Sequence, residues 1–366
     1  MTVLTSFDDY PIHPSSAPIA LTSSSDPNHY DRYFFNGYRR DASLYFGVAL
    51  GLYPNRHVVD ASFSVVVEGS RQVSLHASAR APRDRAQANV VGPIEVRIVE
   101  PMRRHRVIVD SPEHGIRAEL DFTARSGPVQ EPPFLVRSGQ RVTTDYTRLT
   151  QFGHWSGWIE VEGRRHEVEP GSWGSRDRSW GVRPIGPPTD TGAPIAPPQF
   201  YWLWAPVNFE SFATHFDVNE YSDGSRWHEV GFVLPDGEAD AVVASAVEYR
   251  TSLRRGTRWA ETFALDIALP DGSVKKLVFE PLYEFHMSGI GYFNPEWGHG
   301  YWKGDLAVGA EAWDLPVGDP CAPRNVHIQA VCRVRCGENV GLGVLEQLII
   351  GSHRPTGLSG IFDPVP

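Results

Sequence analysis

Turn signals interrupt this sequence so often that helical patterns are scarce. The 366 residues include 30 prolines and 34 glycines, and the short segments between them mostly alternate apolar and polar side chains. That alternation is the period of a half-buried β-strand. Residues 61–77 and 158–168 each contain two such runs around a Glu-Gly pair, which predicts two hairpins. The sequence therefore predicts an all-β fold, either a sandwich or a barrel.

The alternating pattern stops at a proline-rich run in the middle of the chain and then starts again. In the second half, hairpin patterns recur at 212–234 and 325–350. Because the two halves are alike in kind, we expect two antiparallel β-barrels in tandem, and a small closed barrel has room inside for one small ligand. The expected divisions are an extended N-terminal arm over 1–29, a first barrel over 30–185, a proline-rich linker over 186–199 and a second barrel over 200–366.

Composition and charge exclude several classes of partner. A net charge of -10 argues against nucleic acid or an anionic membrane surface, since both require a basic face. No apolar run approaches the roughly 20 residues of a membrane span, and the N-terminal stretch lacks the apolar core of a secretory signal. We therefore expect a cytoplasmic protein without a transmembrane segment. A homodimer stays open.

The cysteines and histidines show no metal-binding spacing, and no cofactor-binding motif is present. Cys332 and Cys336 lie four residues apart in a strand-like run, so we expect both to be small buried thiols on one face. The prediction is a protein with no metal and no cofactor.

The segment 171–184 near the middle of the chain concentrates charge and aromatic residues between glycines. If it is extended, Trp173 and Asp177 share one face, whereas Arg176, Arg178 and Trp180 share the other. An aspartate flanked by two arginines could form an ion-pair junction that clamps the two halves together. It could also hold an ionisable group in an apolar pocket and act directly in catalysis.

Two further carboxylates fall on apolar faces of predicted strands. If residues 223–224 form a two-residue turn, Glu229 lies opposite Val218 among aromatic side chains. Burial there would raise its pKa, as in a general acid that works near neutral pH. The alternative is that Glu229 lies at a rim or pairs with an arginine. Glu346 shares a face with apolar residues of 340–350 and is a second candidate acid.

Two histidines lie in glycine-rich, aromatic surroundings. His299, within 289–304, stands between two glycines, so its side chain is sterically uncovered and could donate or accept a proton. His154, within 152–155, has similar neighbours. For both, the alternative is a structural histidine whose hydrogen bonds are satisfied.

Several of these motifs together resemble a known superfamily. The matching segments are Gly-Ser-Arg-Asp-Arg-Ser-Trp-Gly at 174–181, Phe-Gly-His-Trp-Ser-Gly at 152–157, Trp-Gly-His-Gly at 297–300 and Glu346-Gln347. The sequence resembles the bacterial hydroxyneurosporene synthases (carotenoid 1,2-hydratases), the AttH-like proteins and, more distantly, tocopherol cyclases and lipocalin-like Diels–Alderases. The likeness spans most of the chain, over residues 30–360.

The resemblance implies two lipocalin-like (calycin) barrels packed together, with the 174–181 motif near their junction. It also implies non-redox chemistry at a C=C bond of a hydrophobic, often isoprenoid, molecule. Relatives usually carry histidine where this chain has Arg178. Because an arginine stays protonated, we do not expect that position to transfer a proton here.

Two functions are compatible with these features. The first is a cofactor-independent acid/base enzyme that hydrates, dehydrates, isomerises or cyclises a hydrophobic small molecule of isoprenoid or aromatic type. Protonating an alkene requires a neutral acid held away from water and aromatic faces to stabilise the cation. The second is a carrier that binds a lipid or terpenoid without catalysis. A third reading, a protein–protein scaffold, rests only on the acidic surface and the N-terminal arm.

The enzyme hypothesis assigns roles to specific residues. The predicted catalytic residues are Asp177, Glu229, Glu346, His299 and His154. The predicted substrate-binding residues are Arg176, Trp173, Trp180, Trp202, Trp204, Tyr292 and Trp297.

Overall fold

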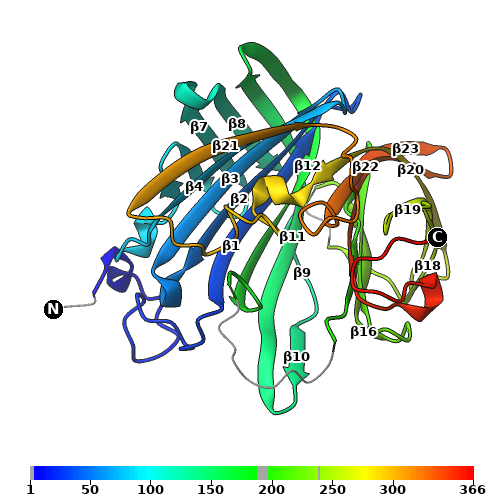
Figure 1. Cartoon of the computed structure of the whole chain (residues 1–366), viewed down its shortest axis with the longest axis horizontal. Coiled ribbons are helices and arrows are strands. Elements are labelled where there is room, and N and C mark those ends of the chain that lie inside the picture. The colour runs from blue at the N-terminus through cyan, green and yellow to red at the C-terminus, as the bar shows by residue number, and fades with distance from the viewer. Residues whose placement is uncertain (1–3, 188–196, 238–239) are drawn as a thin grey trace.

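The computed structural model describes residues 4–187, 197–237 and 240–366. In these residues the regular secondary structure consists of β-strands and short 3-10 helices, and the strands form two antiparallel sheets (Figure 1). The predicted all-β fold of two lipocalin-like units is confirmed. Most of the expected linker, residues 188–196, lies outside the described residues.

The first sheet has 13 strands, in the order β21-β4-β3-β2-β1-β12-β11-β8-β7-β6-β5, with β9 and β10 paired to β11. Its strands are β1 (His29–Tyr38), β2 (Leu44–Tyr53), β3 (Val58–Val67), β4 (Arg71–Arg80), β5 (Val90–Val91), β6 (Ile94–Glu100), β7 (Arg104–Ser111), β8 (Ile116–Ala124), β9 (Val129–Gln130), β10 (Phe134–Ser138), β11 (Arg141–Val161), β12 (Arg164–Val182) and β21 (Leu306–Asp314).

The second sheet has ten strands, in the order β17-β16-β15-β13-β23-β22-β20-β19-β18, with β14 paired to β15 and β23. The strands at the two ends of this order, β17 and β18, are separated in the chain by residues 244–245, so the sheet curls back on itself. Its strands are β13 (Phe200–Trp204), β14 (Val207–Asn208), β15 (Phe212–Glu220), β16 (Arg226–Pro235), β17 (Val242–Val243), β18 (Ala246–Leu253), β19 (Ala260–Ala268), β20 (Val274–His286), β22 (Ile328–Cys336) and β23 (Asn339–Ile350).

Strand β21 belongs to the second half of the chain but forms an edge of the first sheet. It pairs antiparallel with β4, from Leu306 opposite Ala79 to Asp314 opposite Arg71. In Figure 1 it crosses over the first sheet, next to β4. The expected domain divisions stay a prediction, and β21 is a segment of the expected second barrel that lies in the first sheet.

Short 3-10 helices connect several strands. They are η1 (Ser6–Asp9), η2 (Pro54–Arg56), η3 (Arg85–Gln87), η4 (Pro112–His114), η5 (Met287–Ile290) and η6 (Arg354–Thr356). The N-terminal arm contacts the first sheet region, where the Ser6 amide donates to Asp84 Oδ2 at 3.2 Å. Of the described residues, none belongs to a helix long and apolar enough to cross a membrane.

Local sequence patterns explain the hairpins. The predicted hairpin around Glu68-Gly69 is confirmed: residues 68–70 connect β3 to β4, and Glu68 and Gly69 both have positive φ, 51° and 63°. In the second sheet the predicted pairing of Val218 with Glu229 is confirmed, although a bulge between Asn219 and Glu220 separates this pair from the turn. Cys332 and Cys336 are both buried in the same core, as expected.

Apolar side chains occupy the interiors of both units. The first core includes Phe46 and Trp155, and the second includes Phe216 and Phe263. A third apolar cluster, which includes Trp204, combines residues of both sheets where they face each other. The main cavity, described next, also lies at this junction and not in the middle of a barrel core.

Candidate functional site

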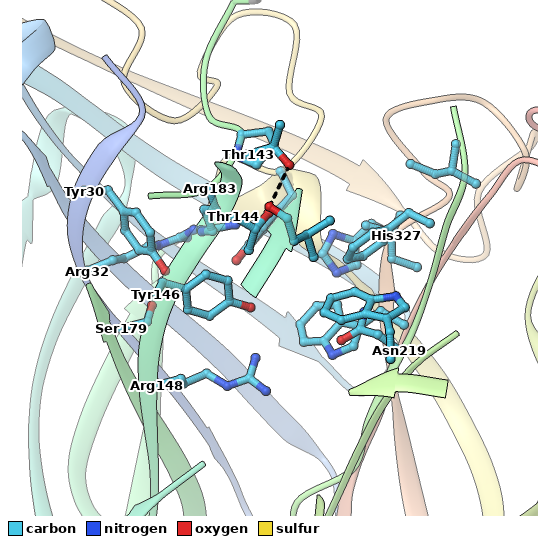
Figure 2. Close-up of a pocket in the computed structure, with 18 of the residues that line it drawn as sticks. Tyr30, Arg32, Thr143, Thr144, Tyr146, Arg148, Ser179, Arg183, Asn219 and His327 are labelled. Atoms are coloured by element: carbon cyan, nitrogen blue, oxygen red, sulfur yellow. Dashed lines mark hydrogen bonds between the residues drawn. The ribbon is translucent and has the colours of Figure 1, made fainter. Parts of the chain in front are cut away.

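A cavity of about 450 Å³ lies between the two sheets. Strands β1, β11 and β12 form one wall, and β13, β15, β16 and β23 contribute the facing wall, together with the loop after η5. Figure 2 shows Tyr30, Arg32, Tyr146, Arg148 and Ser179 on the side of the first sheet, opposite His327 and Asn219. This volume is in the range of small-molecule sites.

The first wall follows from period-two alternation on three adjacent strands. Every second side chain faces the cavity: Tyr30, Arg32 and Phe34 on β1, Tyr146 and Arg148 on β11, and Asp177 and Ser179 on β12. Register then sets the neighbours. Ser179 pairs with Arg32 on one side and with Arg148 on the other. Asp177 is two residues from Ser179, so both arginines lie on its diagonals.

Asp177 is the carboxylate of this wall. Its side chain is half-buried and makes no hydrogen bond or ion pair with any residue in the described ranges. Burial raises the pKa of Asp177 to about 6, although the nearby guanidinium groups of Arg148 and Arg32 act in the opposite direction. A carboxyl group with such a pKa can hold a proton at slightly acidic pH and release it to a bound molecule.

The arginines that flank Asp177 in sequence do not hold it. The Arg176 side chain is buried on the opposite face, where its Nε donates to Gln151 Oε1 at 2.7 Å. Arg178 forms an ion pair with Asp31 and lies over the ring of Tyr33. Of the two alternatives, the ion-pair junction between Asp177 and its two neighbours is wrong, and the predicted alternation of the three side chains between two faces is observed. The arginines around Asp177 come from neighbouring strands.

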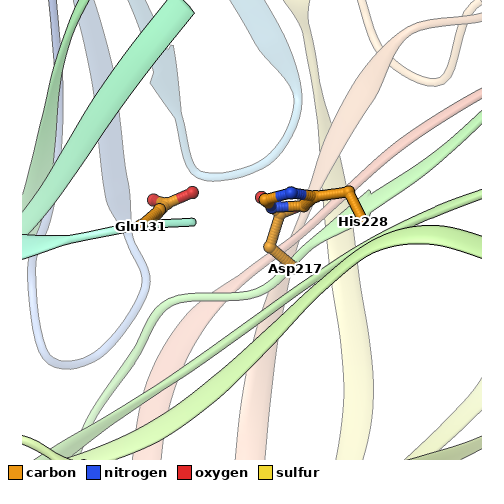
Figure 3. A group of neighbouring side chains, drawn as sticks. All are labelled: Glu131, Asp217 and His228. Atoms are coloured by element: carbon orange, nitrogen blue, oxygen red, sulfur yellow. The ribbon is translucent and has the colours of Figure 1, made fainter. Parts of the chain in front are cut away.

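Behind Arg148 lies a buried charged cluster that joins the two sheets (Figure 3). Arg148 Nε donates to Glu131 Oε2 at 2.8 Å, and its Nη2 bonds both Glu131 and Asp217. His228 Nε2 lies 3.4 Å from Asp217 Oδ2. Burial raises the pKa of Glu131 to about 7. Burial would also raise the pKa of Asp217, but the Arg148 charge holds it well below its usual range.

The same cluster is the one set of described residues with metal-ligand geometry. Ligand atoms of Glu131, Asp217 and His228 lie within 4.8 Å of one another. Arg148 Nη2, however, is hydrogen-bonded to both carboxylates and takes the position that a cation would occupy. The donor set therefore suits an arginine-bridged acid pair and does not fit a metal site.

Glu346 is buried, as expected, and reaches the cavity through a histidine. It accepts hydrogen bonds from His327 Nε2 at 2.7 Å and from Gln329 Nε2 at 2.6 Å. Glu346 itself is not a lining residue, but His327 is. The buried Nδ1 of His327 has no hydrogen-bond partner among the described residues. The pair therefore places a polar, partly unsatisfied ring in the cavity wall.

His299 lines a second cavity of about 430 Å³ that adjoins the first. Its Nδ1 lies 3.1 Å from Arg32 Nη1, and its Nε2 lies 2.9 Å from the Ile290 carbonyl oxygen. Since arginine can only donate and a carbonyl can only accept, His299 is neutral and carries its proton on Nε2. Burial, reinforced by the charge of Arg32, lowers the pKa of His299 far below its ordinary value. Both ring nitrogens of His299 are hydrogen-bonded to the protein, so His299 fits the alternative of a structural histidine.

Two predicted acid/base residues lie away from both cavities. Glu229 is exposed and pairs with Arg226, so the expectation that it is buried among aromatic side chains is wrong. It lies near the turn that connects β15 and β16, where the side chain reaches water. His154 is half-buried on β11, paired in register with Trp173, and burial lowers its pKa.

The predicted aromatic residues divide between cavity, core and surface. Trp202 and Tyr292 line the first cavity, and the indole N–H of Trp202 donates to Asp217 Oδ1 at 2.7 Å. Trp173 and Trp204 are buried in the apolar cluster between the sheets. The other two lie outside both cavities: Trp297 stacks on His76, and Trp180 is 42% exposed.

Several lining residues were not predicted. The clearest are Arg183 and Arg32, together with Arg148, Tyr30, Tyr146 and His327. A signal existed for Arg183, because continuing the alternation of Asp177 and Ser179 along the chain reaches it. The same period-two rule identifies the lining residues of β1 and β11 once one residue of each strand is known to face inward.

Comparisons with known proteins agree with this fold. A crystal structure of a protein from Nitrosomonas europaea described as AttH is similar with a TM-score of 0.55 at 14% identity, covering 93% of this chain and 99% of that one. Two crystal structures of CghA, one with Sch210972, are similar at 11% and 10% identity, with TM-scores of 0.49 and 0.47. They cover 88% of this chain and 88% and 89% of theirs. Among proteins with curated descriptions, none is significantly similar.

The structural likeness to the AttH protein supports the predicted resemblance at the level of the double lipocalin-like fold. A family model described as "Family of unknown function (DUF8625)" matches residues 4–359, which is nearly the whole chain. The chain therefore belongs to this family of unknown function, DUF8625.

Proposed function

We propose that this chain is an acid/base enzyme that acts without a cofactor on a C=C bond of a hydrophobic small molecule of isoprenoid or aromatic type. The observation that carries the proposal is Asp177, a half-buried carboxyl group with a pKa of about 6, without a hydrogen-bond partner among the described residues, in the wall of a cavity between two sheets. The reaction is hydration, dehydration, isomerisation or cyclisation, since each can begin with proton transfer to or from carbon.

The cavity walls support this chemistry. Phe34, Trp202 and Trp227 present aromatic surfaces for the apolar body of the substrate and for a developing cation. Asp177 donates its proton to one alkene carbon, and the cation formed on the other carbon then either adds water or loses a proton. The proton released by the added water or by the neighbouring carbon returns to the Asp177 carboxylate, directly or through water. The carboxylate left behind lies on the diagonals of Arg32 and Arg148, whose charges stabilise it.

The test is proton transfer from solvent to carbon. Purified protein is incubated in D₂O with a panel of isoprenoid and aromatic alkenes, and deuterium in recovered substrate and product is measured by mass spectrometry. We expect deuterium incorporation that falls about tenfold per pH unit above the Asp177 pKa, because a general acid acts in its protonated form. Asp177→Asn should abolish incorporation, and Glu229→Gln, at an exposed ion pair, should leave it unchanged.

A carrier without catalysis is the second candidate. It is favoured by the other predicted acid/base groups, whose hydrogen bonds to the protein leave them few free atoms for a substrate. His299 has both ring nitrogens hydrogen-bonded, and Glu346 is held by two donors. Tight binding of a panel member to wild type and to Asp177→Asn alike, with no deuterium in any compound, would establish the carrier and contradict the enzyme.

A further inference from the structure

Arg183 is a cation without an ion-pair partner among the described residues. It lies just after β12 and lines both cavities. Its guanidinium makes no hydrogen bond or ion pair within residues 4–187, 197–237 and 240–366. Its contacts are the faces of two aromatic rings, with the guanidinium carbon 4.8 Å from the ring centre of Tyr30 and 5.7 Å from that of Tyr292. A guanidinium stacked in this way keeps the N–H donors at its edge free.

Arg32 adds a second charge that forms no ion pair with any described carboxylate, although it lowers the pKa values of Asp177 and Asp60. It is 2% exposed and bonds to neutral partners, His299 Nδ1 and the Ile290 carbonyl oxygen. Its guanidinium carbon lies 4.7 Å from the ring centre of Tyr292, the ring that Arg183 also contacts. A charge taken out of water without a partner is costly.

The third arginine of the cavity wall provides an internal comparison. Arg148 is held by two carboxylates, Glu131 and Asp217. Against Arg32 and Arg183, the cavity wall offers one carboxylate, Asp177, among the described residues. Ionised Asp177 balances one of these two charges, and protonated Asp177 balances neither, so at least one positive charge is left over in either state. The local charge therefore favours a negatively charged ligand.

We infer that the ligand carries an anionic head group, in the simplest case a carboxylate, which binds Arg183 at the boundary between the two cavities. The two cavities share Thr143, Arg183, Pro184, Tyr292 and Phe293, so this position is reached from both. The planar fork of an arginine matches the two oxygens of a carboxylate. The apolar body of the ligand then lies in the first cavity, along Trp202 and Trp227.

This inference deepens the proposed enzyme and rests on it for the location of the substrate. It also links binding to chemistry. Arg183 is one of the charges that lower the pKa of Asp177. An anion on Arg183 offsets that charge, so a bound ligand helps Asp177 to keep its proton until transfer.

Two matched pairs of probes test the inference at pH 7.5, where the acids are ionised: retinoic acid with methyl retinoate, and 2-naphthoic acid with methyl 2-naphthoate. Binding is followed by quenching of tryptophan fluorescence. In wild type, we expect at least one acid to bind about tenfold to a hundredfold more tightly than its ester, the usual effect of a hydrogen bond to a charged group. Arg183→Gln should abolish this ratio, and Arg183→Lys should keep part of it.

The ratio of acid to ester within one protein is insensitive to a general loss of stability, so a partly destabilised variant still gives an answer. Arg250→Gln, which removes an exposed arginine paired with Asp266, is the control and should keep the wild-type ratio. Equal binding of acid and ester to wild type, or an unchanged ratio in Arg183→Gln, would overturn the inference and leave the proposed enzyme standing. Failure of all four probes to bind wild type would overturn both.

Discussion

Asp177 on β12 and Arg148 on β11 lie on the same face of the first sheet, one diagonal step apart across adjacent strands. Burial favours the neutral form of Asp177, whereas Arg148 favours its ionised form. As a result, the carboxyl group can hold a proton near pH 6, and the charge of Arg148 stabilises the carboxylate that forms when the proton leaves. This balance comes from strand register, and not from the arginines next to Asp177 in the sequence.

Replacing Asp177 with asparagine is expected to stabilise the protein near neutral pH. The pKa rises from 3.8 to about 6 on folding. The folded state therefore binds the proton more tightly than the unfolded state, and wild-type stability is lost as pH rises from about 4 through 6. At pH 7.5 the free energy of unfolding of Asp177→Asn should exceed that of wild type by about 1 to 3 kcal/mol. At pH 4 the difference should be much smaller. Urea unfolding at both pH values measures this, and an equal difference at both would contradict the raised pKa.

Loss of Arg148 should be strongly destabilising. Arg148→Met leaves Glu131 and Asp217 buried without their cation, and such a change costs about 3 to 5 kcal/mol. The triple variant that adds Glu131→Gln and Asp217→Asn should recover part of that loss in urea unfolding. Arg250→Met, at an exposed ion pair, should change stability by less than about 1 kcal/mol. A mild effect of Arg148→Met would show that the cluster is more hydrated than its burial indicates.

Trp202 should report ligand binding. It lines the first cavity, whereas Trp180 is largely exposed and lies outside both cavities. Trp202→Phe should therefore lose a substantial part of the fluorescence quenching caused by a bound retinoid, and Trp180→Phe should not. Quenching that survives in Trp202→Phe and disappears in Trp180→Phe would place the ligand elsewhere.

Glu346 and Glu229 form a natural pair for comparison, because both lie on strands with apolar neighbours. Glu346→Gln keeps one acceptor oxygen for the two donors, His327 and Gln329, and should cost about 1 to 3 kcal/mol of unfolding free energy. Glu229→Gln removes an exposed ion pair and should cost less than about 1 kcal/mol. Thermal or urea unfolding of the two variants measures these losses. A larger loss for Glu229→Gln than for Glu346→Gln would contradict the burial of Glu346 and the exposure of Glu229.

Features that depend on local alternation could be predicted from the sequence. The hairpin turn at Glu68-Gly69 and the pairing of Val218 with Glu229 require only strands and turns of short range. The side-chain faces of β12 follow from the same rule, so Asp177 could be placed opposite Arg176. Burial could not be obtained in this way. Glu229 pairs with the core residue Val218 and is nonetheless exposed.

Contacts between distant segments could not be predicted. Arg148 meets Glu131 across 17 positions of sequence and Asp217 across 69, and neither pairing has a local signature. The cavity itself is formed only where the two sheets face each other. Trp173, Trp202 and Trp204 all lie in aromatic, strand-like segments, so the sequence does not distinguish them. Trp202 lines the cavity, whereas Trp173 and Trp204 are buried in the apolar cluster beside it.

The pairing of β21 with β4 also bears on how the protein could be divided. Nine residues of the second half supply the hydrogen-bonding neighbour of β4. A fragment that ends before residue 197 would leave the backbone N–H and C=O groups of β4 bare along that whole length. Bare edges of this kind recruit strands from other molecules. Separately produced halves would therefore tend to self-associate, and both must be present in one solution for the edge to be covered.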